Sequence, residues 1–188
     1  MPKDQPVQLD VKSTEVVFAG KIWDVVREKF DYAGSELARE FVLHPGAVAI
    51  LALDDQQRVL MIRQYRHPVR EYLWEIPAGL LDVAGESRLE AAKRELHEET
   101  GYFADVWSEL TSFHTTPGGN NETITIFLAQ QLRHVGYDEA LEGEEVDMQV
   151  EWVPIEDALA AALAAEIRSP SAVVGILALG HRLGISAG

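Results

Sequence analysis

Carboxylates are unusually dense in residues 75–102, where they are interspersed with glycines and apolar residues. This stretch reads EIPAGLLDVAGESRLEAAKRELHEETGY. Its seven acidic residues are Glu75, Asp82, Glu86, Glu90, Glu95, Glu98 and Glu99. Because like charges at helical spacing destabilise a helix by a few tenths of a kcal/mol per pair, a cation is expected to offset the repulsion. A hard divalent ion held by oxygen ligands is the natural candidate.

Residues 86–100 are predicted to form a helix, with Glu86 in its first turn and Gly101 as the left-handed residue that ends it. At about 100° per residue, three apolar side chains form a narrow core-facing stripe: Leu89, Ala92 and Leu96. Three carboxylates lie beside this stripe rather than opposite it: Glu95, Glu98 and Glu99. Arg94 neighbours Glu98 on the wheel and can hold a carboxylate such as Glu86 in place. The remaining face is expected to contact solvent and carries Glu90, Lys93 and His97.

The wheel alone leaves two interpretations open, a metal-binding face and an acidic face that is only solvated. Two further features favour a metal. The loop PAGLLDVAG before the helix contains glycines, which allow backbone carbonyls to approach a ligand closely. A second acidic loop at 137–147 can supply a base from Glu142, Glu144 or Glu145. Oxygen ligands of this kind suit Mg²⁺ or Mn²⁺, and Mg²⁺ typically acts on substrate phosphates.

The composition excludes several classes of protein. The chain has 188 residues, a formal net charge of −15 and no cysteine. The charge argues against binding to nucleic acid or to an anionic membrane, and the lack of cysteine excludes disulfides, thiolate zinc sites and cysteine nucleophiles. The opening residues MPKDQPVQLD lack the apolar core of a signal peptide, and no apolar run approaches the ~20 residues of a membrane span. A soluble cytoplasmic protein is expected.

Residues 1–44 are predicted to form a tail and a small antiparallel sheet. Three β-prone pieces, STEVVFAG, KIWDVVREKFDY and ELAREFVLH, are separated by turn signals at Gly20 and at 33–35. Three short strands are marginally stable alone. The sheet is therefore expected either to pack on the rest of the chain or to exchange with a second subunit, and we expect a homodimer.

Residues 45–188 are predicted to form the second domain, in which strands and helices alternate. The apolar run 47–53 is typical of a strand covered on both faces, and it is predicted to pair with 58–66 as a hairpin. Further strands are expected at 73–79, 102–110, 123–132 and 148–155, with helices at 155–167 and after Ser169-Pro170. This order predicts an α/β fold in which a mixed sheet lies between helices.

Residues 94–102, RELHEETGY, match the REUxEExGU half of the Nudix box, where U is a bulky apolar residue. Seven residues separate Glu86 from Arg94, which is the family's spacing. Six residues separate Gly79 from Glu86, one more than the usual five, so the intervening loop carries one extra residue. The chain thus resembles the Nudix hydrolase superfamily. This resemblance implies an α/β/α sandwich and hydrolysis of a nucleoside diphosphate that is linked to another group.

The resemblance also implies a role for each matching position. The ligands of Mg²⁺, or of Mn²⁺ as its substitute, would be Ala78 through its carbonyl, Glu95, Glu98 and Glu99. Structural support would come from Gly79, Glu86, Arg94 and Gly101. The catalytic residues would be Glu98 and a base from the late acidic loop, with Glu144 as the first choice and Glu145 as the second. A merely solvated loop is the alternative for these last two glutamates.

Three features outside the box are similar to the ADP-ribose pyrophosphatase branch of the superfamily. They are the extra N-terminal strands, the segment IRQYRHPVREYLWEIPAG at 62–79, and Pro117, which lies sixteen positions after Gly101 (117 − 101 = 16). Substrate contacts would then come from Trp23, Arg39, Arg66, Glu75 and Pro117. For Trp23, packing under the small sheet is the alternative to stacking on adenine. For Arg39, the alternative is an ion pair with Glu36 or Glu40.

This branch implies hydrolysis of ADP-ribose to AMP and ribose 5-phosphate. Two other functions stay open: hydrolysis of another nucleoside diphosphate sugar such as GDP-mannose, and a Nudix-fold sensor that binds a nucleotide without turnover. The crowded carboxylates argue against a sensor, because a pure binder does not need them. An anionic substrate requires a local reversal of the negative charge, and divalent ions could supply it together with Arg63, Arg66 and Arg70.

Overall fold

A computed structural model describes residues 1–136 and 148–185 of the chain. These residues form two compact units. The first unit comprises Met1–Pro45 and His114–Glu122, and the second comprises Gly46–Phe113 and the chain from Thr123 onward. The loop 114–122 thus belongs to the same unit as the N-terminal strands, although it is distant from them in sequence.

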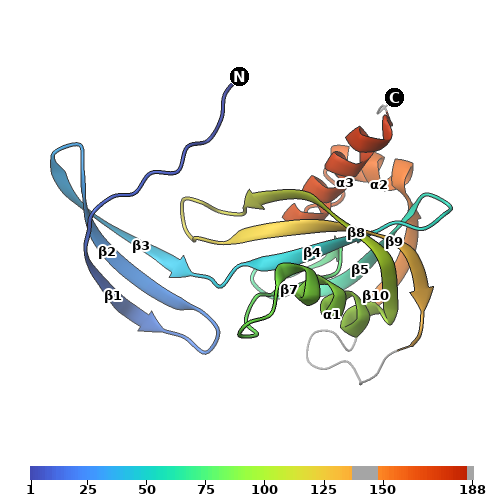
Figure 1. Cartoon of the computed structure of the whole chain (residues 1–188), viewed down its shortest axis with the longest axis horizontal. Coiled ribbons are helices and arrows are strands. Elements are labelled where there is room, and N and C mark those ends of the chain that lie inside the picture. The colour runs from blue at the N-terminus through green and yellow to red at the C-terminus, as the bar shows by residue number, and fades with distance from the viewer. Residues whose placement is uncertain (137–147, 186–188) are drawn as a thin grey trace. The chain divides into compact units, whose positions relative to one another are not determined.

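The first unit is built on an antiparallel sheet in the order β1-β2-β3 (Figure 1). Its strands are β1 (Val11–Ala19), β2 (Asp24–Tyr32) and β3 (Ser35–Leu43). Every residue of β1 is exposed, whereas Val26 of β2 is only 2% exposed. The small antiparallel sheet predicted from the sequence is confirmed.

The second unit carries two further sheets and the helices. One sheet has the strand order β7-β4-β9-β8 and the other has the order β10-β5-β6. The elements are β4 (Ala47–Ala52), β5 (Arg58–Arg66), β6 (Glu71–Glu75), β7 (Ala78–Leu80), α1 (Arg88–Thr100), β8 (Tyr102–His114), β9 (Thr123–His134), β10 (Gln149–Pro154), α2 (Ile155–Leu163) and α3 (Pro170–Leu183).

Strand β4 is the centre of the second unit. It pairs in parallel with β9 and antiparallel with β7, and all six of its residues are buried. Because successive side chains of a strand point to opposite faces, Val48 and Ile50 pack in the cluster that contains Leu96 of α1. Ala49 and Leu51 pack instead with residues of α2 and α3. The predicted α/β fold, with a mixed sheet between helices, is confirmed.

The predicted hairpin between 47–53 and 58–66 is wrong. Strands β4 and β5 belong to different sheets, and the isolated bridge Leu53↔Val59 lies at the point where they diverge. The carboxylate of Asp54 closes the turn by accepting hydrogen bonds from the backbone N–H groups of Gln56 and Arg58 and from the Arg58 guanidinium. Strand β5 then pairs with β6 and β10 instead.

Helix α1 begins two residues later than predicted, at Arg88. Ser87 is its N-cap, and the Ser87 hydroxyl accepts a hydrogen bond from the N–H of Glu90, so Glu86 lies before the helix rather than in its first turn. Gly101 ends the helix with φ of 69°, in the left-handed region as predicted. His97 is not on a solvent face as expected, because it is 9% exposed and its ring stacks on Phe103 of β8 at 4.3 Å.

The second helix is shorter than predicted, since α2 ends at Leu163 rather than at residue 167. Ala165 has φ of 58°, a left-handed conformation that does not continue a helix. Helix α3 begins at Pro170, and Ser169 occupies the N-cap position as predicted. None of the helices within residues 1–136 and 148–185 combines the length and the hydropathy needed to cross a bilayer.

Candidate active site

One guanidinium organises the acidic residues around helix α1. Arg94 donates from Nε and Nη2 to the two carboxylate oxygens of Glu86, at 3.1 and 3.0 Å. Its Nη1 donates to Glu95 at 2.6 Å and to Glu98 at 2.9 Å. The pairing of Arg94 with Glu86 follows the prediction, and the same side chain also holds two of the four predicted metal ligands, Glu95 and Glu98. Arg94 lowers the pKa of Glu86 below its ordinary value because it stabilises the carboxylate form.

Glu95 is packed against the backbone of the loop that precedes the helix. A Cβ atom built on Gly79 would lie 1.9 Å from the carboxyl carbon of Glu95 and 2.0 Å from its Oε1. A methyl group at position 79 would therefore displace the Glu95 carboxylate, and the extra residue between Gly79 and Glu86 does not prevent this close approach. Burial raises the pKa of Glu95; Arg94 opposes this shift, while the charges of Glu98 and Asp82 add to it.

Glu99 links the helix to the same loop. It is 5% exposed, and its Oε2 accepts a hydrogen bond of 2.9 Å from the backbone N–H of Ala78. Glu98 is the open member of the set, with a side chain that is 55% exposed. The structure therefore brings Ala78, Gly79, Glu95 and Glu99 together, while Glu98 lies toward solvent and reaches the group through Arg94.

These side chains suit a divalent metal ion by their chemistry. Glu95, Glu98 and Glu99 offer only oxygen donors, which hard cations prefer. Nη1 of Arg94 already places one positive charge between Glu95 and Glu98. Within residues 1–136 and 148–185, no three acidic, histidine or cysteine side chains enclose a common point as they stand. A bound ion would thus either share the carboxylates of Glu95 and Glu98 with Arg94 or displace the guanidinium from them.

Arg66 and Glu75, both predicted to contact substrate, are bonded to each other. Nε and Nη2 of Arg66 donate to the two oxygens of Glu75 at 2.9 and 2.8 Å, across the β5–β6 pair. Glu75 is 5% exposed, whereas the Arg66 side chain is 41% exposed. Such a two-bonded pair fixes the plane of the guanidinium. Glu75 therefore supports Arg66 directly.

The other predicted substrate residues lie in the first unit. The ring of Trp23 stacks on His44 at 4.3 Å, and Arg39 donates to the carbonyl of Ala38. The ion pair considered for Arg39 with Glu40 is instead made by Arg27, whose Nε and Nη2 lie 2.8 and 2.7 Å from Glu40. Pro117 lies in the loop that the first unit includes.

Hydrogen bonds fix the loop 114–122 within the first unit. Its Gly119 carbonyl accepts from the N–H of Val42 at 3.0 Å. Glu122 lies 3.2 Å from Nε2 of His44 and also accepts from the hydroxyl of Thr115. These contacts hold the segment around Pro117 beside β3. The network of Glu122 was not predicted, although its position directly after the PGGNN turn marks it as a residue of that loop.

The predicted base, Glu144 or Glu145, lies outside the described residues, as does the rest of 137–147. Sequence reasoning missed two neighbours of the site within the described chain. Asp82 contributes to the raised pKa of Glu95, and its place in the acidic stretch was the available signal. Phe103 covers His97, and no pattern within the helix itself indicates that contact.

Comparisons with known proteins agree with this geometry. Residues 43–173 match the NUDIX domain. The ADP-ribose pyrophosphatase of Mycobacterium tuberculosis (strain ATCC 25618 / H37Rv) is 44% identical over 168 residues, which cover 89% of this chain and 81% of that protein. The ADP-ribose pyrophosphatase of Bacillus subtilis (strain 168) is 40% identical over 146 residues, which cover 77% of this chain and 78% of that protein.

The fold comparison gives the same result. A crystal structure of an ADP compounds hydrolase superposes with a TM-score of 0.77 over 97% of each chain, at 20% sequence identity. At this identity the likeness concerns the fold. The family match instead covers the acidic helix, its glycine loop and most of the second unit. The chain therefore belongs to the NUDIX domain family.

Proposed function

We propose that this protein hydrolyses the diphosphate bond of ADP-ribose and releases AMP and ribose 5-phosphate. The observation that carries the reaction type is the group formed by Glu95, Glu98 and Glu99 of α1 with the loop at Ala78. The choice of ADP-ribose is supported by the two relatives named as ADP-ribose pyrophosphatases, at 44% and 40% identity. Water is the nucleophile, and its attack on phosphorus separates the two phosphates.

Nudix hydrolases generally need a divalent metal ion, and we propose Mg²⁺ for this chain, with Mn²⁺ as a substitute. The ligands would be Glu95, Glu98, Glu99 and the carbonyl of Ala78. When bound, the ion neutralises the diphosphate and lowers the pKa of a coordinated water. The protein holds the ligands ready for this, because Gly79 confines Glu95 and the N–H of Ala78 orients Glu99. Arg94, which is itself held by Glu86, positions Glu95 and Glu98 through its Nη1.

A carboxylate base would remove the proton from the attacking water. Glu144 remains our first choice and Glu145 our second, and both are predictions from the sequence. Arg66 would contact a phosphate or ribose oxygen, with its guanidinium held in plane by Glu75. Trp23, Arg39 and Pro117 remain proposed substrate contacts, as predicted from the sequence. A cytoplasmic location likewise remains a prediction.

We also propose that the protein is a homodimer in which the first unit supplies the contact surface. Large apolar side chains on this unit are exposed, including Val16 at 53%, Phe18 at 63% and Ile22 at 66%. Apolar surface of this kind is a common feature of interfaces. Sedimentation velocity at micromolar concentration is expected to show a dimer that Phe18→Asp converts to monomer. A monomeric wild-type protein would refute the dimer.

The function is tested by incubating the protein with ADP-ribose or GDP-mannose and Mg²⁺, and measuring release of AMP or GMP. ADP-ribose is expected to be the faster substrate, and EDTA or Glu98→Gln to abolish the release. Faster GMP release would transfer the assignment to another nucleoside diphosphate sugar. Binding of ADP-ribose without any release would identify a sensor instead.

A further inference from the structure

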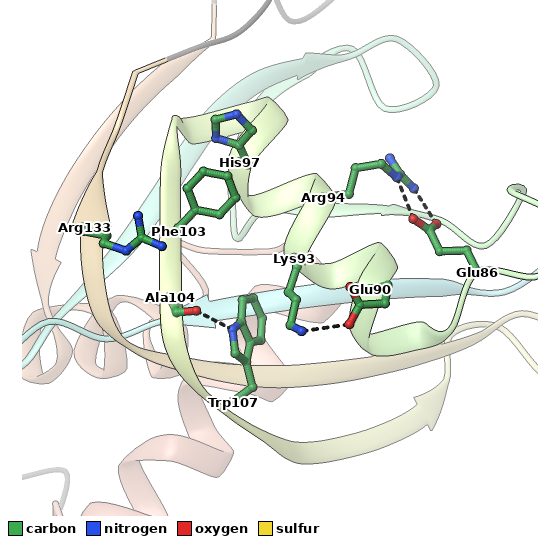
Figure 2. A pocket seen from close by; sticks show the side chains of 9 residues that line it. All are labelled: Glu86, Glu90, Lys93, Arg94, His97, Phe103, Ala104, Trp107 and Arg133. Atoms are coloured by element: carbon green, nitrogen blue, oxygen red, sulfur yellow. Dashed lines mark hydrogen bonds and ion pairs between the residues drawn. The ribbon is translucent and has the colours of Figure 1, made fainter.

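The side of α1 that bears Lys93 and His97 forms one wall of a pocket. These positions lie on the opposite side of the helix from Glu95, because two residues correspond to about 200° of rotation. The other walls come from Phe103 and Trp107 of β8 and Arg133 of β9, and the volume is about 350 Å³ (Figure 2). This size lies at the lower end of the range found for small-molecule sites, roughly 300–1,000 Å³.

Aromatic rings make up much of the pocket wall. Phe103 is stacked on His97 at 4.3 Å with an angle of 15° between the rings, and the Arg133 guanidinium lies 5.4 Å from the Phe103 centroid. The indole Nε1–H of Trp107 donates to the carbonyl of Ala104 at 2.9 Å, which fixes the orientation of this ring. Figure 2 shows the rings of Phe103 and Trp107 on the same strand, facing the helix. A planar ligand ring can stack on such surfaces.

The pocket lining carries three cations that differ in how firmly they are held. Lys93 pairs with Glu90 at 2.8 Å, and Arg94 pairs with Glu86, Glu95 and Glu98. Arg133 is held less firmly, since its Nε lies 3.7 Å from Asp105 and its side chain is 60% exposed. A cationic side chain held this loosely can turn toward a ligand anion. A loosely held cation beside half-buried aromatic rings favours a ligand that combines an aromatic ring with an anionic group.

We propose that this pocket binds a planar aromatic anion of the size of a nucleoside monophosphate. The ring stacks on Trp107 and contacts the edge of Phe103, whose faces are covered by His97 and Arg133, and the phosphate contacts Lys93 and Arg133. The site is separate from the carboxylates of the proposed active site and requires no metal ion. It nevertheless shares Arg94 with them, so the ligand contacts the side chain that holds Glu95 and Glu98.

The test uses AMP as the probe and the indole N–H signals of the four tryptophans as the readout. The ¹H–¹⁵N spectrum is recorded in EDTA, so that no metal-dependent binding contributes. AMP is expected to shift the signal of Trp107, which is assigned by Trp107→Phe, and to leave that of Trp152 in place. A shift confined to Trp23 or Trp74, or no shift at all, would overturn the proposal.

Calorimetry with a matched pair of variants gives a second measurement, which does not depend on Trp107→Phe being folded. Arg133→Gln is expected to weaken AMP binding at least tenfold. Arg58→Gln is the control, because Arg58 also lies over an aromatic ring, that of Trp152 at 5.7 Å, but outside the pocket. Equal loss in both variants, or loss in Arg58→Gln alone, would contradict the site.

Two further ligands separate the parts of the proposed interaction. Adenosine carries the ring without the phosphate, and inorganic phosphate carries the anion without the ring. Each is expected to bind more weakly than AMP by tenfold or more. Phosphate binding as tight as that of AMP would show that the rings take no part, and equally tight adenosine binding would show that the cations take none. Either result would refute a site for an aromatic anion.

Discussion

In two different regions an arginine forms ion pairs with several glutamates. These arginines are Arg94 in the second unit and Arg27 in the first. Arg94 contacts three carboxylates. Its side chain is 29% exposed, and the side chains of Glu86 and Glu95 are 15% and 14% exposed. Arg27 contacts Glu40 and Glu15, but all three side chains are between 41% and 67% exposed.

The difference shows that burial, rather than the number of ion pairs, distinguishes an ordered group of side chains from ion pairs on a solvated surface. Exposed ion pairs are screened by water and contribute roughly 0–1 kcal/mol. Around Arg94, Glu86 and Glu95 are largely buried and Glu95 is packed against Gly79, so these two carboxylates have defined positions, whereas Glu98 is 55% exposed. Four changes test this contrast, from the largest expected effect to the smallest.

Removing a predicted metal ligand is expected to have the largest effect. Glu98→Gln or Glu99→Gln should lower metal-dependent hydrolysis by more than about 100-fold, since even indirect partners of a metal site are worth about 10–100-fold. Circular dichroism should show an intact fold. Glu40→Gln, beside Arg27, is the matched control and should retain full activity. Near-normal turnover in both ligand variants would show that the carboxylates near Arg94 contribute no more to activity than those near Arg27.

Gly79→Ala tests whether Glu95 is confined by close approach. The added methyl group would overlap the Glu95 carboxylate, so this side chain must move. The expected result is a fall in activity on the order of 100-fold, since small misplacements cost this much. Gly118→Ala is the control, because a Cβ there meets nothing within 4 Å. Equal activity of Gly79→Ala and wild type would show that the position of Glu95 does not depend on Gly79.

Replacing each arginine by lysine compares the two regions directly. Lysine keeps the charge but loses the planar fork that holds two oxygens of Glu86. Arg94→Lys is therefore expected to reduce activity about 10–100-fold, with a higher Mg²⁺ concentration needed for half-maximal rate. Arg27→Lys should change the free energy of unfolding by less than about 0.5 kcal/mol and leave the rate unaltered. Similar losses of activity in Arg94→Lys and Arg27→Lys would show that the two regions do not differ in function.

Asp54 and Arg58 form an intermediate case, with Asp54 at 16% and Arg58 at 37% exposure. Burial alone would raise the pKa of Asp54, but the hydrogen bonds from Arg58 and Gln56 together lower it below its ordinary value of 3.8. A depressed pKa in the folded state stabilises the protein above the unfolded-state pKa, and this contribution is lost as the pH falls through the folded-state value.

Thermal unfolding between pH 7 and pH 2 tests this assignment. At pH 7, Asp54→Asn should unfold at a lower temperature than wild type. The free energy of unfolding should fall by about 1–3 kcal/mol, which is typical of hydrogen bonds to a charged group. The two curves should converge toward pH 2. A constant gap between them across the whole range would show that the charge of Asp54 is not the cause.

The sequence predicted the parts of the site that depend on spacing along one element. The pairing of Arg94 with Glu86 and the left-handed Gly101 both follow from residues within a short segment. Contacts that require another element were not predicted. Glu99 bonds to the N–H of Ala78, and Arg66 bonds to Glu75 across two strands, and neither contact leaves a local pattern.

The errors have a related origin. The helical wheel assigned His97 to solvent because it considers α1 alone, whereas Phe103 of β8 covers this ring. The β4–β5 turn resembled a hairpin because both flanking strands are apolar and adjacent in sequence. Each strand instead completes its pairing with strands that come much later in the chain, β9 for β4 and β10 for β5.

The short segment Ile76-Pro77 crosses from one sheet of the second unit to the other. Glu75 is the last residue of β6, Ala78 is the first of β7, and the Pro77 carbonyl accepts from the N–H of Ile50 at 2.7 Å. Three residue steps of extended chain span at most about 10 Å. The covalent chain thus sets an upper limit to the separation between the backbone of Glu75, which holds Arg66, and the backbone at the proposed metal ligands. The crossing therefore keeps these two parts of the proposed site within a short distance of each other.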